Sequence, residues 1–281
     1  MASELSASFA LTPADVAGGL ALSTASGWNQ TADDWQLFIT HGHVVGVRDD
    51  DGEIVATAAA LPYGGGAGWI SMVLVTPAWR NRGLATRLMN DCVKHLQSRS
   101  ITPVLDATPA GSMVYRRMGF VPGFELERWE NGAVDVAPAP SSACRVASSN
   151  DLAQIEKLDA AANGLDRRLL LQSLLSREDT RAWLSHDEQG FVILRRGLRA
   201  LQVGPLVAAD EQAAIALSQA AMSVAQGPVF LDVPRRWAAI GEWLSAHGFR
   251  HQRPFVRMAL GPAQITQVND RLFVIAGPEF G

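Results

Sequence analysis

The pattern of apolar and polar positions changes sharply within the first third of the chain. Residues 69–75 are almost entirely apolar and have the length and branching of a buried strand. Pro77 ends this run because proline has no N–H to give to a sheet ladder. Beyond it, apolar residues recur at helical spacing, which predicts an amphipathic helix with one buried face; they are Ala85, Leu88, Met89, Cys92, Val93 and Leu96.

The rest of the first half follows the same logic. Apolar alternation, capping residues and turn residues predict the order β-α-α-β-β-β-α-β-α-β. This order is typical of a mixed sheet flanked by helices, an α/β or α+β fold. The predicted segments are a strand at 6–12, helices at 13–26 and 32–40, a hairpin joining 44–47 to 54–61, the unit at 69–96, a strand at 102–106, a helix through Tyr115 and a closing strand at 124–129.

The second half reads as a diverged copy of the first. A strand ending in Asp, a following Pro, a helix and a Gly-Phe pair occur in both halves, with 14 residues from Asp106 to Phe120 and 17 from Asp232 to Phe249. Such internal repetition indicates a duplicated unit. Residues 131–143 between the copies are small and Pro-rich, as in a linker. We therefore predict two domains, residues 1–137 and 138–281.

The turn between the buried strand and its helix carries candidate chemistry. It reads Arg80-Asn81-Arg82-Gly83-Leu84-Ala85. The first amides of a helix lack intrahelical partners and lie at the positive end of its dipole, so they suit a phosphate. A surface loop with solvated arginines explains the hexapeptide equally well. The second half has Asp210 and Glu211 at the equivalent helix start, and these carboxylates would repel a phosphate.

Composition narrows the class of protein. Hydrophobic residues make up 48% of the 281, without an apolar run of the ~18 residues that a membrane span needs. A signal peptide is not evident at the start, so a cytoplasmic location without a membrane partner is expected. The net charge of −4 gives no support for a nucleic-acid partner. Cys92 and Cys144 form neither a disulfide framework nor a metal-ligand cluster, so no metal is expected.

Three motifs in a fixed order resemble the GCN5-related N-acetyltransferase (GNAT) superfamily. They are the strand end at 73–77, the Arg-x-x-Gly-x-Ala turn, and Tyr115-Arg116-Arg117-Met118-Gly119-Phe120, together spanning roughly 69–122. With LDATPAG in the first half and GPLVA, LDVP and HGF in the second, the chain resembles bacterial two-domain members. In those members the C-terminal domain is a degenerate acetyltransferase-like domain. The resemblance implies two tandem GNAT-like domains, each with a mixed sheet flanked by helices.

The resemblance also implies an acetyl-coenzyme A site in the first half. The strand residues Val73, Leu74 and Val75 would contact the pantetheine arm and the thioester. The amides of Arg82, Gly83, Leu84, Ala85 and Thr86, with Arg80 and Asn81 nearby, would bind the pyrophosphate. A backbone amide aimed at the developing oxyanion is the largest electrostatic contribution expected in acyl transfer.

Tyr115 and Asp106 are the catalytic candidates. Tyr115 matches the tyrosine that acts as general acid toward the leaving thiolate in this superfamily; the alternative is a core tyrosine bonded to backbone. Asp106 is a candidate general base for the amine. It stands where many members have Asn, so it could instead hold the splayed strands apart by hydrogen bonds. In the loop between the first two helices, Trp28, Asn29 and Gln30 could line the acceptor pocket or anchor the loop to the core.

These features predict an acetyl-coenzyme A-dependent N-acetyltransferase that acts on a small-molecule amine by direct transfer in a ternary complex. A coenzyme A-binding sensor without turnover is one alternative, and acetylation of a protein or peptide amine is another. Acceptor pockets are built from loops, which carry no transferable code.

Overall fold

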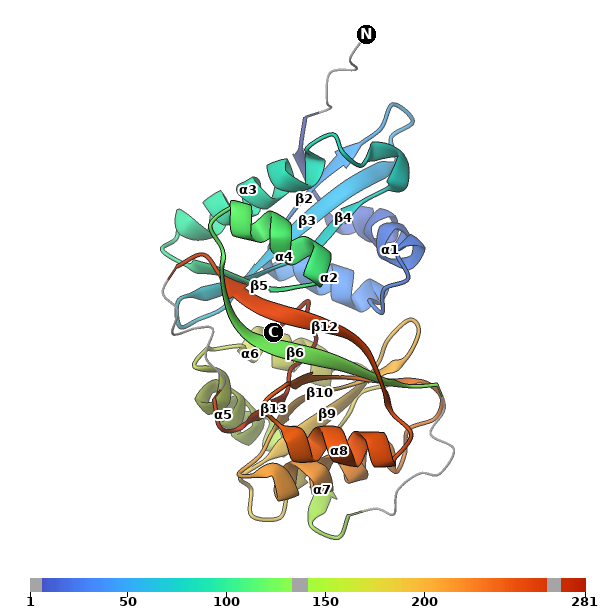
Figure 1. The fold of residues 1–281 in the computed structure, drawn as a ribbon, viewed down its shortest axis with the longest axis vertical. Coiled ribbons are helices and arrows are strands. Elements are labelled where there is room, and N and C mark those ends of the chain that lie inside the picture. Colours follow the sequence, from blue (N-terminus) through green and yellow to red (C-terminus); the bar gives the residue numbers. More distant parts are fainter. Residues whose placement is uncertain (1–6, 133–140, 262–268) are drawn as a thin grey trace.

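The computed structural model describes residues 7–132, 141–261 and 269–281. Within these residues a single 13-stranded sheet runs through the molecule, and helices cover its faces (Figure 1). The predicted mixed α/β architecture is confirmed. The predicted domain boundary at 137/138 lies outside the described residues.

The first half contains six strands and four helices among its described residues. Its elements are β1 (Phe9–Ala10), α1 (Val16–Ala25), α2 (Ala32–His41), β2 (His43–Arg48), β3 (Ile54–Pro62), β4 (Ala67–Val75), α3 (Leu84–Gln97), β5 (Thr102–Ala107), α4 (Pro109–Arg117) and β6 (Val121–Asn131). The second half has β7 (Cys144–Val146), α5 (Leu152–Asn163), α6 (Arg168–Leu175), β8 (Arg181–Ser185), β9 (Phe191–Arg196), β10 (Leu201–Val207), α7 (Glu211–Met222), β11 (Val229–Pro234), α8 (Ala238–Ala246), β12 (Arg250–Ala259) and β13 (Leu272–Val274).

The two halves exchange their last long strands. The sheet order is β1-β2-β3-β4-β5-β12-β6-β11-β10-β9-β8-β7, with β13 added to β10. Strand β12 from the second half pairs antiparallel with β5, and β6 from the first half pairs with β11. Figure 1 shows β6 and β12 side by side across the middle of the molecule. Residues 124–129 form a strand as predicted, and this strand, β6, pairs with β11 and β12 of the second half.

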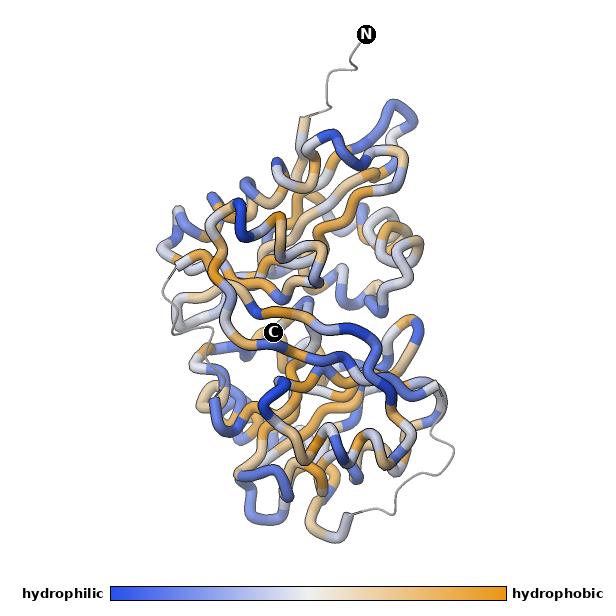
Figure 2. Tube along the Cα trace, viewed as in Figure 1, coloured by the Kyte–Doolittle hydropathy of each residue, from blue (hydrophilic) through white to orange (hydrophobic). Residues whose placement is uncertain are grey.

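Local patterning explains most elements, and apolar segments run through the interior strands (Figure 2). The face of α3 predicted from its spacing is buried in full apart from Ala85, which is partly exposed. In the second half, strands β8, β12 and β13 and helix α6 were not predicted. The short apolar runs of β8 and α6 satisfy neither period clearly.

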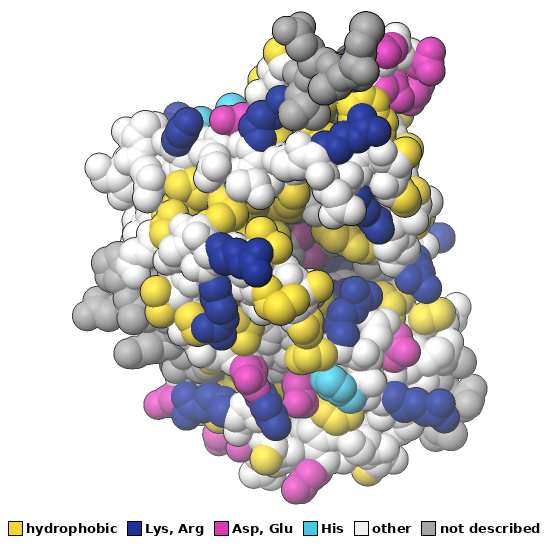
Figure 3. Space-filling view, turned by 45° about the horizontal axis from the view of Figure 1, so that its top comes forward, with side chains coloured by type: hydrophobic (Ala, Val, Ile, Leu, Met, Phe, Trp, Pro, Cys, Tyr) yellow, Lys and Arg dark blue, Asp and Glu magenta, His cyan; other side chains and the backbone are white. Residues whose placement is uncertain are grey.

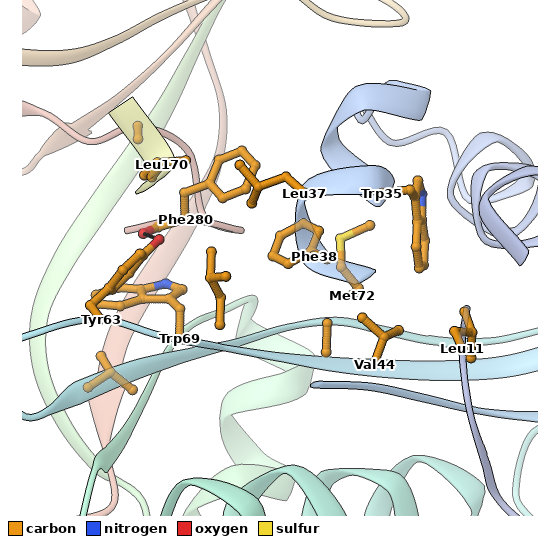
Figure 4. Close-up of a cluster of buried hydrophobic side chains, with 14 of the residues drawn as sticks. Leu11, Trp35, Leu37, Phe38, Val44, Tyr63, Trp69, Met72, Leu170 and Phe280 are labelled. Atoms are coloured by element: carbon orange, nitrogen blue, oxygen red, sulfur yellow. Dashed lines mark hydrogen bonds between the residues drawn. The ribbon is translucent and has the colours of Figure 1, made fainter. Parts of the chain in front are cut away.

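The C-terminal residues join the core of the first half. The Phe280 ring stacks on that of Phe38, with centroids 5.1 Å apart. The buried Tyr63 hydroxyl donates a hydrogen bond of 2.9 Å to the Phe280 carbonyl, and Trp69 lies beside them (Figure 4). Residues at 275–281 are thus part of the structure that surrounds strand β4.

Candidate active site

Strands β4 and β5 separate partway along their length. Their parallel pairing covers only Ala67 to Trp69 on β4, opposite Thr102 to Val104 on β5. Past this point β4 bulges against β3, where Met72 takes a φ of 54° and its carbonyl accepts a 2.8 Å hydrogen bond from the Thr57 hydroxyl. Strand β5 instead stays paired with β12 through Ala107. The two strands therefore form a wedge whose open end faces the C-terminal end of β4.

A cavity of about 160 Å³ occupies this wedge. Both halves of the chain line it, and Figure 3 shows a recess in one face of the molecule with hydrophobic, Lys and Arg side chains beside it. Engineered protein cavities of about 150 Å³ hold a benzene-sized molecule, so this space suits a small ligand. The lining residues are Gly27–Gln30, Ile70–Val73, Leu105–Thr108, Tyr115, Arg128, Phe230, Arg253, Phe255, Pro278 and Glu279.

The predicted phosphate turn lies at the start of α3. Gly83 has a φ of 77°, and a Cβ placed on it would meet no atom within 4 Å. The first intrahelical bond runs from Arg87 N to Gly83 O, so the amides of Leu84, Ala85 and Thr86 precede the ladder. The turn thus has bare, exposed backbone and three amides that can bind an anion. It does not line the cavity, and neither do Leu74 and Val75.

The arginines of the turn are held by backbone contacts. Arg80 Nε donates to the Val75 carbonyl at 3.2 Å, and an Arg82 amino group donates to the Ala78 carbonyl at 3.2 Å. The Arg82 guanidinium also lies over the Trp79 ring, 4.7 Å from its centroid. Asn81 has a φ of 61°, which together with Gly83 produces the tight reversal. Both arginines are exposed, without an ion pair to a described carboxylate.

Tyr115 lies on α4 and lines the cavity. Its ring is partly buried against Phe120, with centroids 6.0 Å apart. None of the described residues hydrogen-bonds its hydroxyl, in contrast to a structural core tyrosine such as Tyr63. Burial raises the pKa of Tyr115 to about 12, so its hydroxyl stays protonated at neutral pH.

The Asp106 side chain is fully buried and paired with Arg257 of β12. Its two oxygens accept hydrogen bonds of 2.9 Å from Arg257 Nε and from an amino group of the same guanidinium. Arg257 in turn lies over the rings of Trp69 and Phe124, at 4.4 and 4.8 Å. Burial raises the pKa of Asp106, and the charge of Arg257 opposes this rise. The pair joins β5 to β12 at the floor of the wedge.

The predicted acceptor loop divides into two roles. The buried Asn29 side chain accepts from the amides of Arg199 and Ala200 at 2.9 and 3.0 Å, and donates to the Ala200 carbonyl at 3.1 Å. It therefore anchors the loop to the hairpin between β9 and β10. Gln30 also lines the cavity, and its side-chain oxygen has no hydrogen-bond partner among the described residues. Trp28 is half-buried at the cavity wall.

Sequence reasoning missed several lining residues, most of them from the second half. They are Arg128, Phe230, Arg253, Phe255 and Glu279. Arg128 belongs to the first half but reaches the second through the strand exchange, where it forms a buried bidentate pair with Asp232 at 2.8 Å. Charged residues within apolar strands were the available signal, although their partners could not be assigned without the strand order.

The start of α7 carries the two carboxylates that were expected to repel a phosphate, and both accept backbone hydrogen bonds. The Asp210 side chain accepts a hydrogen bond from Ala213 N at 2.8 Å, and Glu211 accepts one from Ala239 N at 3.0 Å. Among the described residues there is no cluster of three His, Cys, Asp or Glu that could hold a metal ion. None of the helices within the described ranges is long and apolar enough to cross a membrane.

Comparisons with known proteins agree with the two-domain arrangement. The family model described as the acetyltransferase (GNAT) family matches residues 20–120, and the model described as the acetyltransferase (GNAT) domain matches residues 155–274. The chain is 27% identical over 220 residues to holothin acyltransferase of Pseudoalteromonas sp. (strain SANK 73390), covering 75% of this chain and 72% of that protein. It is 24% identical over 241 residues to the uncharacterized N-acetyltransferase YitH of Bacillus subtilis (strain 168), covering 83% and 84%.

Solved structures share the fold over nearly the whole chain. A Pyrococcus horikoshii protein described as a candidate acetyltransferase has a TM-score of 0.83 at 19% identity, covering 100% of this chain and 98% of that one. A tandem GNAT protein from the clavulanic acid biosynthesis pathway has a TM-score of 0.65 at 16% identity, covering 92% and 99%. The protein is therefore a two-domain member of the GNAT acetyltransferase superfamily.

Proposed function

We propose that the protein is an acetyl-coenzyme A-dependent N-acetyltransferase that acetylates a small-molecule amine by direct transfer. The observation that carries this proposal is the wedge between β4 and β5. The wedge opens into a cavity lined by Tyr115, and β4, which forms one side of the wedge, leads to the Gly83 turn. The relative named holothin acyltransferase supports acyl transfer as the reaction class.

The residues at the start of α3 fit the donor. The amides of Leu84, Ala85 and Thr86 would bind the pyrophosphate, and the open space at Gly83 allows its close approach. Exposed Arg80 and Arg82 add positive charge at the same turn. When bound, acetyl-coenzyme A supplies an acetyl group activated as a thioester. The bulged backbone at Met72 and Val73 faces the wedge, where its N–H groups can stabilise the developing oxyanion.

Tyr115 would donate a proton to the leaving thiolate. Its hydroxyl has no competing partner among the described residues, and its raised pKa, about 12, keeps it protonated over the pH range of an enzyme assay. Asp106 has both oxygens committed to Arg257, so we assign it the alternative role of fixing β5 to β12. In this role it sets the width of the wedge without touching the amine.

A small acceptor agrees better with the cavity than a peptide does. Loop residues 27–30 and the C-terminal residues Pro278 and Glu279 line the cavity together with the strands. The backbone of a peptide would need an open groove or a free strand edge to lie in. Here β12 fills the edge of β5 that an added strand would use.

Calorimetric titration with acetyl-coenzyme A, combined with a thiol-release assay over a panel of amines, tests this function. Tight binding and turnover with at least one small amine is the expected result. Tight binding without turnover for any amine would favour a coenzyme A sensor instead. A Tyr115→Phe variant should retain donor binding and lose most turnover, and full turnover in that variant would remove the acid role.

A further inference from the structure

The cavity wall contains three compensated charge pairs. Arg128 is paired with Asp232, and Asp106 with Arg257, both through two hydrogen bonds. Glu279 accepts a hydrogen bond of 2.8 Å from Arg195 through one of its two oxygens. Each of these charges therefore has a fixed partner of opposite sign.

Arg253 is the exception among the cavity's charged side chains. It lies on β12, half-buried, and no described carboxylate comes within 4 Å of its guanidinium. Its Nε donates to the Gln252 side-chain oxygen at 3.0 Å, and its terminal amino groups have no hydrogen bond among the described residues. Burial and the nearby charge of Arg128 lower the pKa of Arg253. The cavity therefore has one positive charge that a ligand can compensate.

Two buried polar atoms of other lining residues also lack partners among the described residues. Gln30 and Ser71 are lining residues of the cavity, and neither the Gln30 side-chain oxygen nor the Ser71 hydroxyl has a hydrogen-bond partner among the described residues. Their residues are only 6% and 9% exposed. Buried polar groups are nearly always hydrogen-bonded, so unpaired ones at a cavity wall indicate ligand contacts. An oxygen such as that of Gln30 can only accept, which matches the N–H of an amine.

We propose that the acceptor is a small amine that also carries an oxyanion, a carboxylate or a phosphate, which Arg253 binds. This inference rests on the proposed function and adds the chemical class of its acceptor. The free terminal amino groups of Arg253 can bind such an oxyanion in a fork. The amine end lies toward Gln30 and Ser71.

The spacing along β12 agrees with a molecule of this size. Val256 pairs with Ala107 at the wedge, and Arg253 lies three residues before Val256 on the same strand. At about 3.3 Å per residue, the backbone distance between Val256 and Arg253 is about 10 Å. The distance from the wedge to the guanidinium is shorter if the long Arg253 side chain extends toward the wedge. An amine and an anion separated by a few bonds fit between the two points. Phe230 and Phe255 provide an apolar wall for the body of the acceptor.

Matched amine pairs test the inference by turnover. Phenylalanine is compared with phenethylamine, leucine with isoamylamine, and phosphoethanolamine with ethanolamine. We expect the anionic member of at least one pair to have a kcat/KM about 10- to 100-fold higher, the effect of a charge-assisted hydrogen bond. The preferred pair distinguishes carboxylate from phosphate. Equal or greater kcat/KM for the neutral members would overturn the inference and leave the proposed function intact.

Three variants assign this preference to one side chain. Arg253→Met should lower kcat/KM for the anionic member to about that of the neutral member, whereas Arg253→Lys should retain part of the preference. Arg250→Met, which removes an exposed arginine from the same strand outside the cavity, is the matched control and should behave as wild type. A preference that survives Arg253→Met would contradict the assignment.

Product binding provides a readout that does not need turnover. N-acetylphenylalanine and N-acetylphenethylamine are titrated calorimetrically into protein saturated with coenzyme A, with N-acetylphosphoethanolamine as the phosphate arm. If wild-type protein binds an anionic product and Arg253→Met abolishes this binding, the anion site is supported. This holds even if no amine reacts, and in that case only the proposed function is refuted. Failure of every anionic product to bind more tightly than the neutral one would overturn the inference.

Discussion

The pair formed by Asp106 and Arg257 leads to a prediction that separates two roles for the aspartate. Asp106→Asn removes the negative charge while Arg257, 5% exposed at its side chain, stays buried beside it. Removing one partner of a buried ion pair costs about 3–5 kcal/mol, because the other charge is left uncompensated. For a chain of this size such a loss corresponds to a decrease in Tm of about 6 to 20 °C.

The double variant Asp106→Leu/Arg257→Met restores compensation by removing both charges. Replacing a buried pair by apolar residues is often neutral. Loss of the Arg257 contacts with the Trp69 and Phe124 rings lowers the free energy of unfolding by about 1 kcal/mol. Contacts of the Met side chain with the same rings restore part of this loss. We therefore expect the double variant to unfold within about 1–2 kcal/mol of wild type and to regain most of the turnover that Asp106→Asn loses.

Urea unfolding monitored by tryptophan fluorescence gives the stability, and thiol release gives kcat on the same samples. A general base would behave differently, because its loss abolishes turnover without regard to charge compensation. If Asp106→Asn keeps its wild-type stability and loses activity, or if the double variant is stable and inactive, the positioning role is refuted. Asp106 would then be reinstated as the candidate base.

Three further predictions concern the donor turn, the acid and the acceptor loop. Gly83→Glu should weaken coenzyme A binding by calorimetry about 30-fold or more, ~2 kcal/mol, since a carboxylate enters the anion site; Gly52→Glu, at an equally open turn with a φ of 85°, should not. Because the pKa of Tyr115 is raised to about 12, kcat should show no basic decline from this group up to a pH of about 10; a decline at lower pH that Tyr115→Phe removes would contradict this. Asn29→Ala should lower the free energy of unfolding by about 1–3 kcal/mol by unpairing buried amides. Gln30→Ala should raise KM with a smaller change in stability, and the reverse ranking would disprove the division of roles.

The order of elements in the first half and the donor turn were predictable from sequence because both depend on local patterns. Helical spacing from Ala85 to Leu96, the proline after β4 and the glycine at the turn each report on a few neighbouring residues. The cavity's far wall was not predictable. Arg253 reaches the cavity because the strand exchange places β12 beside β5, and Glu279 reaches it because the C-terminal residues pack against the first half. Alternating strand patterns specify a face and not a partner strand.

The loop at residues 28–30 shows the same limit on a smaller scale. Its polar residues predicted either a pocket or an anchor, and the structure has both in adjacent positions. A side-chain amide in this loop acts as an anchor only if it hydrogen-bonds the backbone of the hairpin at Arg199 and Ala200, as Asn29 does. That hairpin lies about 170 residues away in the chain.

The strand exchange has a consequence for folding on the ribosome. The edge of β5 that β12 covers has no partner until Arg250 to Ala259 have been synthesised, about 140 residues after Ala107. At a translation rate of about 5–20 residues per second this edge waits roughly 7 to 30 s. An unpaired strand edge is a template for pairing between chains. The nascent first half is thus prone to aggregate until β12 has been synthesised, and the addition of this strand is coupled to the closing of the active site.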